Sequence, residues 1–196
     1  MEKSISAKKT FMLNRVIILT LVTIVVSFAG FSQKVHAKTA KEIDASADAA
    51  LDRFYKQVEG AKEVARKAKG LLILPDVKKA GLILGGEYGQ GALRIHGKTV
   101  DYYRLMSGSI GIQIGAQAKD IVIAFMTDDA LKSFRTSEGW EAGLDGNVAL
   151  ITVGGGASVT TMISNHPILG FVYDVKGFIG DFSLKGAKFT KIDMSQ

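Results

Sequence analysis

A strict alternation of apolar and polar residues marks the middle of the chain. From Ser107 onward, isoleucine or alanine at positions 110, 112, 114 and 116 alternates with serine, glycine or glutamine at the positions between them. This period of two is typical of a β-strand with one apolar face, and a helix does not tolerate it. The pattern predicts a strand over Ser107–Ala118, inside a sheet-forming stretch that runs from Gly81 to Lys119.

Shorter segments with strand character lie on both sides of this stretch. Nineteen of the 22 glycines fall between Gly81 and Gly186, which argues against long helices there. Leu71–Leu74 is an apolar run that stops at Pro75-Asp76 and suits a buried strand or a helix end. The other predicted strands are Leu82–Tyr88, Ala92–His96, Thr99–Leu105, Ile121–Met126, Asn147–Val153, Ser158–Ile163, Ile168–Tyr173, Phe178–Leu184 and Ala187–Ile192.

Helical spacing is confined to two places. Between Lys41 and Lys69, apolar residues recur at intervals of three and four, which predicts an amphipathic helix that Gly60 divides or bends. A short helix is predicted over Asp128–Phe134, with Thr127 as its N-cap and two aspartates in its first turn.

The order of these elements predicts an α+β fold. Helices come first and many strands with tight connections follow, so we expect N-terminal helices packed on a strongly bent, mostly antiparallel, glycine-rich β-sheet that curls towards a barrel. With 47% hydrophobic residues the chain can bury a sizeable core. No linker divides the later residues, so we expect 38–196 to form a single domain.

The N-terminus has the three parts of a secretory signal peptide. Residues 1–15 are basic, residues 16–29 are an almost uninterrupted apolar run, and Val35-His36-Ala37 fits the end of a cleavage site. We predict a signal peptide over residues 1–37, and therefore export to the periplasm or the extracellular space, with a peripheral membrane location as one possibility. An uncleaved N-terminal anchor is the alternative, although the apolar run is shorter than the roughly twenty residues that a spanning helix needs.

Composition narrows the classes of function. The chain has no cysteine, which excludes disulfides, thiol catalysis and thiolate metal sites. Of the net charge of +6, residues 1–37 carry five basic side chains and one acidic one, which leaves +2 for the rest. A nearly neutral body lacks the basic stripe of a nucleic-acid-binding protein, so we expect no nucleic-acid partner.

A group of basic side chains is the candidate binding site. Lys62, Arg66 and Lys69 follow the spacing of one helix face, and three further lysines lie nearby. Such runs are usually a solvated surface, with Glu63 and Lys67 as an ordinary ion pair, and we prefer that interpretation. The alternative is attraction of anionic lipid headgroups. The candidate headgroup-binding residues are Lys62, Arg66, Lys67, Lys69, Lys78 and Lys79.

Enzymatic and metal-dependent functions have weak support. Ser107 or Ser109 with His96 and Asp101 could form a hydrolytic triad, but no nucleophile elbow is present. Gly85–Gly91 does not match a phosphate-binding loop and is better explained as a glycine-bent strand or turn. His96 and His166 lie in turn signals without accompanying ligands, so we expect no metal, no cofactor and no catalytic residue.

Trp140 is the only tryptophan, in a predicted loop after the short helix. It could anchor the protein at a membrane interface, but a place in the core or under a lid is the preferred interpretation.

Several motifs together resemble those of the SYLF-domain family. They are Gly85-Gly86-Glu87-Tyr88-Gly89, the glycine and glutamine strand from Ser109 to Gln117, Phe125-Met126-Thr127 and the glycines of Lys176–Asp181. The resemblance spans roughly Ala40–Asp193. It implies a lipid-binding module, linked in eukaryotic relatives to phosphoinositides and actin patches and in exported bacterial relatives to phospholipid. Since no partner module accompanies the domain and an exported protein does not meet actin, we do not expect actin binding.

The resulting hypothesis is non-catalytic binding of phospholipid, or of an anionic membrane surface, by an exported bacterial envelope protein. The alternative is an envelope structural or protein-interaction module that uses strand edges or apolar patches and has no lipid ligand. A hydrolase is a distant third.

Overall fold

Two helices begin the part of the chain that the structure describes. The computed structural model describes residues 38–81, 84–110, 117–152, 163–177 and 183–194, all within the unit 38–196. Helix α2 (Ala40–Gln57) begins at a capping box in which Thr39 and Glu42 bind each other's backbone N–H groups. Helix α3 (Ala61–Lys67) follows Gly60, whose left-handed backbone (φ 77°) turns the chain. The predicted division of the helical segment at Gly60 is confirmed.

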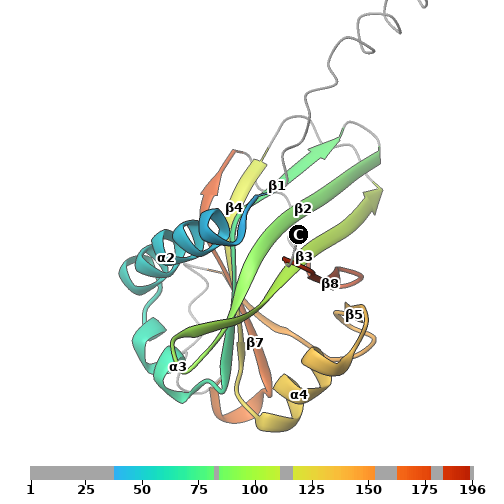
Figure 1. The fold of residues 1–196 in the computed structure, drawn as a ribbon. Coiled ribbons are helices and arrows are strands. Elements are labelled where there is room, and N and C mark those ends of the chain that lie inside the picture. The colour runs from blue at the N-terminus through green and yellow to red at the C-terminus, as the bar shows by residue number, and fades with distance from the viewer. Residues whose placement is uncertain (1–37, 82–83, 111–116, 153–162, 178–182, 195–196) are drawn as a thin grey trace, which may run out of the picture. The chain divides into compact units, whose positions relative to one another are not determined.

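The described strands form one curled, eight-stranded sheet, with the order β5-β8-β3-β2-β1-β4-β7-β6 (Figure 1). Every neighbouring pair is antiparallel except β6 and β7, which are parallel. The sheet curls into a half-barrel, which confirms the predicted α+β class. The strands are β1 (Gly70–Gly81), β2 (Leu84–Ile95), β3 (Lys98–Ile110), β4 (Gln117–Phe125), β5 (Trp140–Glu141), β6 (Ala149–Thr152), β7 (Ile168–Lys176) and β8 (Lys188–Ile192).

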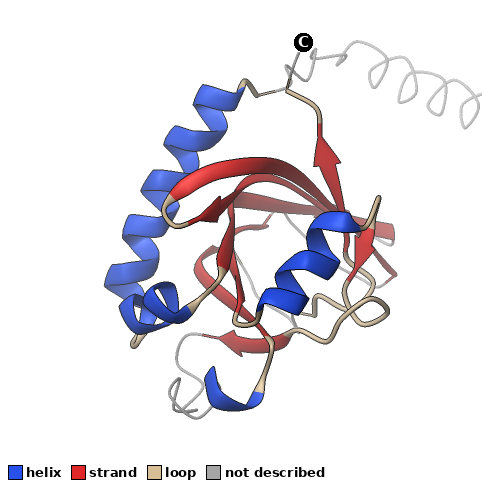
Figure 2. Cartoon of the chain, turned by 60° about the horizontal axis from the view of Figure 1, so that its bottom comes forward, coloured by secondary structure: helices blue, strands red, loops and turns tan. Residues whose placement is uncertain are grey.

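Each face of the sheet has its own apolar core. The convex outer face packs against α2 and α3, and Phe54 of α2 meets Phe171 of β7 edge to face at 5.1 Å. The concave inner face packs against helix α4 (Asp128–Thr136), which begins at the predicted N-cap Thr127. Figure 2 shows the long helix α2 outside the curl and α4 on the other side of the strands. Burial of each large apolar side chain contributes roughly 1.5–3 kcal/mol to these cores.

Strand β1 continues past Pro75, where the sequence predicted a stop. The pairing register shifts between Ile73 and Lys78 on the β2 side, which marks a bulge, and Asp76 has a positive φ of 52°. A bulge accommodates a proline, which lacks an N–H donor, without ending the strand. The strand interpretation of Leu71–Leu74 is confirmed, and the stop at Pro75 is wrong.

Strand β2 crosses the turn that was predicted between Tyr88 and Ala92. A side chain at Gly91 would place its Cβ 2.0 Å from the carbonyl oxygen of Ile73, and one at Gly89 would reach 2.7 Å from Val77 Cγ2. These glycines therefore allow β1 to approach closely and do not form a turn. The prediction of two separate strands is wrong, whereas the preference for a strand over a phosphate-binding loop is confirmed.

The predicted strand Ser107–Ala118 is divided between two strands. Ser107–Ile110 is the end of β3, and Gln117–Ala118 is the start of β4, with β2 and β1 between them in the sheet. Residues 111–116 lie outside the described residues. The alternating pattern indicated strand conformation, but it could not show that the two ends pair with different neighbours.

The remaining predictions hold for the strands that the structure describes. Strands β4, β6, β7 and β8 confirm the segments predicted at 121–126, 147–153, 168–173 and 187–192, with shifted ends. Most of Ser158–Ile163 and Phe178–Leu184 lies outside the described residues, and Ile163 itself is helical. No helix in the described ranges is long and apolar enough to cross a membrane.

Trp140 belongs to the inner core. It forms the start of β5, is 1% exposed, and lies 5.5 Å from the ring of Phe134 and 5.7 Å from the ring of Phe189. The preferred core interpretation is confirmed, and the interfacial-anchor alternative is wrong for this fold, because the ring has no access to a membrane.

Candidate functional site

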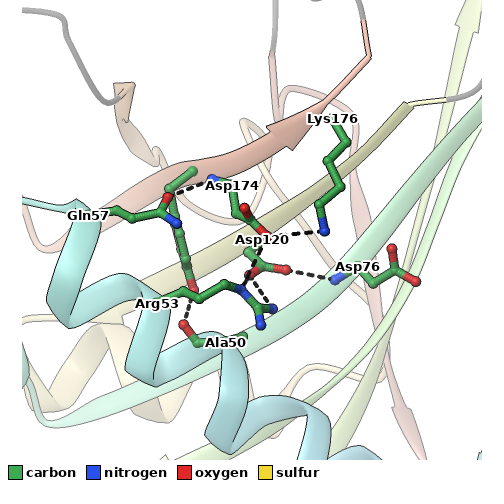
Figure 3. Close-up of polar contacts among 8 residues, drawn as sticks. Ala50, Arg53, Gln57, Asp76, Asp120, Asp174 and Lys176 are labelled. Carbon is green, nitrogen blue, oxygen red and sulfur yellow. Dashed lines mark hydrogen bonds and ion pairs between the residues drawn. The ribbon is translucent and has the colours of Figure 1, made fainter.

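A network of charged side chains lies beneath the C-terminal half of α2 (Figure 3). Asp120 of β4 is 2% exposed and accepts hydrogen bonds from Arg53 Nε at 2.8 Å and from the backbone N–H of Asp76 at 2.9 Å. Arg53 Nη2 lies 2.6 Å from the same carboxylate, and its Nε lies 3.2 Å from Asp174. Partial burial alone would lower the pKa of Arg53, but the hydrogen bond and charge of Asp120 raise it.

Irregular backbone on both sides of Asp120 supplies further contacts. Asp76 on β1 and Asp174 on β7 both have positive φ, of 52° and 48°. The N–H of Asp174 donates to Gln57 Oε1 at 3.2 Å, and the hydroxyl of Tyr173 donates to the carbonyl of Ala50 at 2.9 Å. The network therefore attaches α2 to three neighbouring strands, which is a structural role.

The N-terminal half of α2 is held in the same way by strands β2 and β3. Asp44 accepts hydrogen bonds from the hydroxyls of Thr99 and Tyr102, each at 2.8 Å. Asp48 accepts from Arg94 Nη1 at 2.6 Å. Since α2 is fixed by polar contacts from β3 to β7, it lies diagonally across the outer face and leaves the far ends of β1, β2 and β3 uncovered (Figure 1).

A second group of charges is buried on the inner face. Lys119 Nζ donates to Glu87 Oε1 at 2.9 Å, and Lys79 Nζ lies 3.6 Å from the same oxygen. The side chains of Lys119 and Glu87 are 5% and 7% exposed. Burial lowers the pKa of Lys119, and the bond to Glu87 partly opposes that shift. Lys119 and Lys79 thus share the carboxylate of Glu87. The geometry of this cluster does not identify a reactive group.

The residues considered for a hydrolytic triad are not assembled. His96 occupies the turn between β2 and β3, whereas Ser107 lies about 30 Å further along β3 at 3.3 Å per residue. Asp101 is bound instead to Arg135 Nε at 3.0 Å and to the ammonium of Lys191. Ser109 pairs with Gly85 at the same far end of β3 as Ser107. The described geometry offers no support for serine hydrolase chemistry.

The six predicted headgroup-binding residues fall into two groups. Lys62, Arg66 and Lys67 are exposed on α3, and Lys69 is exposed directly after it. Lys78 and Lys79 lie about 30 Å away along β1. Lys78 is exposed on the outer face, whereas Lys79 points to the inner face and is bound to Glu87.

Carboxylates neutralise only part of the group around α3. Lys67 pairs with Glu63 at 2.8 Å, as predicted, and Lys69 pairs with Asp128 at 3.2 Å. The hydrogen bond and charge of Lys67 lower the pKa of Glu63. Lys62 and Arg66 have no carboxylate within ion-pair distance among the described residues, so these two exposed cations are not neutralised by a direct ion pair.

The buried roles of Arg53, Glu87, Lys119 and Asp120 were not predicted from the sequence. One signal was available, since Lys119 and Asp120 directly precede the apolar run from Ile121 to Phe125. A charged residue in a strand that is buried on both faces needs a partner. The identity of the partners could not be found, because they come from β2 and α2.

The described residues form an α+β half-barrel. Its buried charged side chains connect α2 to the sheet and connect strands of the sheet to one another. A family model described as Ysc84: Las17-binding protein actin regulator matches residues 106–194. Residues 106–194 therefore form a domain of the Ysc84/SYLF family, which confirms the resemblance for the motifs that lie within this range. The match covers the end of β3 through β8, so α2, α3, β1 and β2 precede it. Among curated proteins, no match to the chain is found.

Proposed function

We propose that this protein binds anionic phospholipid at a membrane surface without catalysing a reaction, and that it does so after export to the cell envelope. Lipid binding is consistent with the Ysc84/SYLF family. The signal-peptide pattern of residues 1–37 supports export. The actin-regulating role in the family description is not transferred, because an exported protein does not meet actin.

The observation that carries the proposal is the exposed positive charge around α3. Four basic side chains, Lys62, Arg66, Lys67 and Lys69, lie within eight residues, and two carboxylates bind only two of them. Each cation near an anionic membrane contributes about 1 kcal/mol. Ion pairs between exposed side chains are worth about 0–1 kcal/mol, so Lys67 and Lys69 can exchange their partners for lipid phosphates at little cost.

Vesicle co-sedimentation tests the proposal. The full chain is expected to bind vesicles of equimolar phosphatidylglycerol and phosphatidylcholine at low salt, to bind pure phosphatidylcholine weakly, and to bind the anionic vesicles more weakly as salt screens the charges. The leader is both apolar and basic, so it would add to binding of both kinds of vesicle and to the preference for the anionic kind. Charge variants that leave the leader unchanged separate its contribution from that of α3. Equal binding to both kinds, or binding to neither, would contradict the proposal.

A pair of charge variants tests the role of α3. Lys62→Gln with Arg66→Gln is expected to weaken binding to the anionic vesicles at least about tenfold, because two cations of about 1 kcal/mol each are lost. The control, Lys41→Gln with Lys185→Gln, removes the same charge from exposed positions at the start of α2 and before β8. An equal loss of vesicle binding in both variants would show that binding depends on the net charge of the protein and not on the basic residues of α3.

A further inference from the structure

One row of side chains crosses six strands on the outer face, beyond the part that α2 covers. Directly paired residues of neighbouring strands point to the same face of a sheet. The pairs run from Lys176 to Ala118, Lys78, Tyr88, Met106 and Lys188 in that order. We call Lys176, Lys78, Tyr88, Met106 and Lys188 the outer strip. At about 4.8 Å per strand it is about 24 Å long.

The middle of the outer strip is apolar and exposed. Tyr88 is 43% exposed and Met106 is 55% exposed, and they are direct cross-strand partners on β2 and β3. The next pair on the same face, Gly86 and Gly108, has no side chains, and a Cβ built at Gly108 would have open space around it. Among the described residues, the pair Gly86 and Gly108 therefore places no side chain between Tyr88 and Met106 and a flat surface that approaches from this side.

Basic side chains lie on both sides of the apolar pair. The side chains of Lys78 and Lys176 are more than 70% exposed and lie 3.4 Å from Asp76 and Asp174 respectively. Exposed ion pairs of this kind contribute little, and Arg53 already binds Asp174. Lys188, at the other end, is exposed and faces Glu141 in the register.

We propose that the outer strip is the part of this protein that enters the interface of an anionic bilayer, which rests on the function proposed above. Tyrosine combines an apolar ring with a polar hydroxyl and is enriched at the level of lipid headgroups. The lysines on both sides reach the phosphates while their aliphatic stems lie along the membrane surface. A convex face that is apolar at its centre and basic at its ends complements a deformable anionic layer.

The outer strip predicts an apolar component of binding that salt does not remove. Salt screens the contacts of lysine with phosphate, but it does not weaken the burial of Tyr88 and Met106 in the interface. The full chain is therefore expected to retain part of its binding to phosphatidylglycerol and phosphatidylcholine vesicles at high salt. The double variant Tyr88→Ser with Met106→Ser is expected to lose that part and to bind about tenfold more weakly.

A matched control separates this surface from exposed apolar residues in general. Val100, on the same strand as Met106, is 41% exposed, and Leu144, in the turn after β5, is 78% exposed. Val100→Ser with Leu144→Ser is expected to bind like the unchanged protein. Since all four residues are exposed, each variant should keep its circular dichroism spectrum and its melting temperature.

The outcomes distinguish this inference from the proposed function. If the unchanged protein binds anionic vesicles and the Tyr88/Met106 variant binds equally well at all salt concentrations, the outer strip is not the contact and only this inference fails. If the control variant loses as much binding as the strip variant, the strip is not specific. If the unchanged protein does not prefer anionic vesicles, the proposed function fails.

Discussion

At the scale of single residues, two buried tyrosines show that the effect of a hydroxyl group on stability depends on whether it has a hydrogen-bond partner. Tyr103 is 1% exposed, and its hydroxyl has no hydrogen-bond partner among the described residues. Tyr173 is equally buried, but its hydroxyl donates to the carbonyl of Ala50 in α2. An unpaired buried hydroxyl costs stability, whereas a paired one contributes to it.

Replacing each tyrosine by phenylalanine tests this contrast. Tyr103→Phe is expected to raise the free energy of unfolding by about 1 kcal/mol, because an unsatisfied polar group is removed. Tyr173→Phe is expected to lower it by about 1 kcal/mol, because the bond to Ala50 is lost. Urea unfolding of both variants measures the two changes. Destabilisation of similar size in both would show that the Tyr103 hydroxyl has a partner in solution.

Burial of Tyr103 also predicts that its contribution to stability is lost at alkaline pH. Burial raises the pKa of Tyr103 to about 12 from its ordinary value of 10. The folded state therefore keeps the proton more tightly than the unfolded state, so this contribution is complete below pH 10 and is lost as the pH rises towards 12. Melting temperatures across this range should fall less steeply in Tyr103→Phe than in the unchanged protein. Parallel curves would contradict this assignment.

At the scale of elements, β2 can run unbroken beside β1 because residue 91, where the backbone of β1 comes closest, is a glycine. Gly91→Ala would force its Cβ to within 2.0 Å of the Ile73 carbonyl oxygen, which the backbone cannot relieve without moving a strand. A loss of roughly 1–3 kcal/mol is expected, as for other overpacked sites. Gly108→Ala, with open space around the new methyl group, should change stability by less than about 0.5 kcal/mol. Equal effects in urea unfolding would contradict the close approach.

The elements also show what could be predicted from sequence. Periodicity found both N-terminal helices, the cap at Thr127 and the strand character of most of the sheet, because these are local properties. It misplaced the ends at Pro75 and between Tyr88 and Ala92, because a bulge and a close strand contact are set by the neighbouring strand. Partners far apart in sequence, such as Arg53 and Asp120, could not be predicted, since they depend on how α2 crosses the sheet.

The candidate binding surface was predictable only in part. The basic residues near α3 were visible as a helical pattern, and Lys78 was included among them. The outer strip was not visible, because Lys176, Tyr88, Met106 and Lys188 are brought together only by the registers of six strands. Lys78 and Lys79 are neighbours in the sequence, yet they lie on opposite faces of β1, so only Lys78 belongs to the outer strip.

At the scale of the whole molecule, the two faces of the half-barrel have different roles in this account. The inner face holds a closed aromatic core around Phe134 and Trp140, with α4 packed against it. The outer side carries the positive charge of α3 and the outer strip, on either side of α2. A membrane is therefore expected to contact the outer side and to leave α4 in water.

Site-specific fluorescence tests this orientation most directly. The chain has no cysteine, so Met106→Cys and Lys132→Cys each give a single labelling position, one in the outer strip and one exposed on α4. With a polarity-sensitive dye on each, vesicles of equimolar phosphatidylglycerol and phosphatidylcholine are expected to shift the emission to the blue at position 106 and to leave position 132 unchanged. A shift at position 132 without one at position 106 would contradict the account.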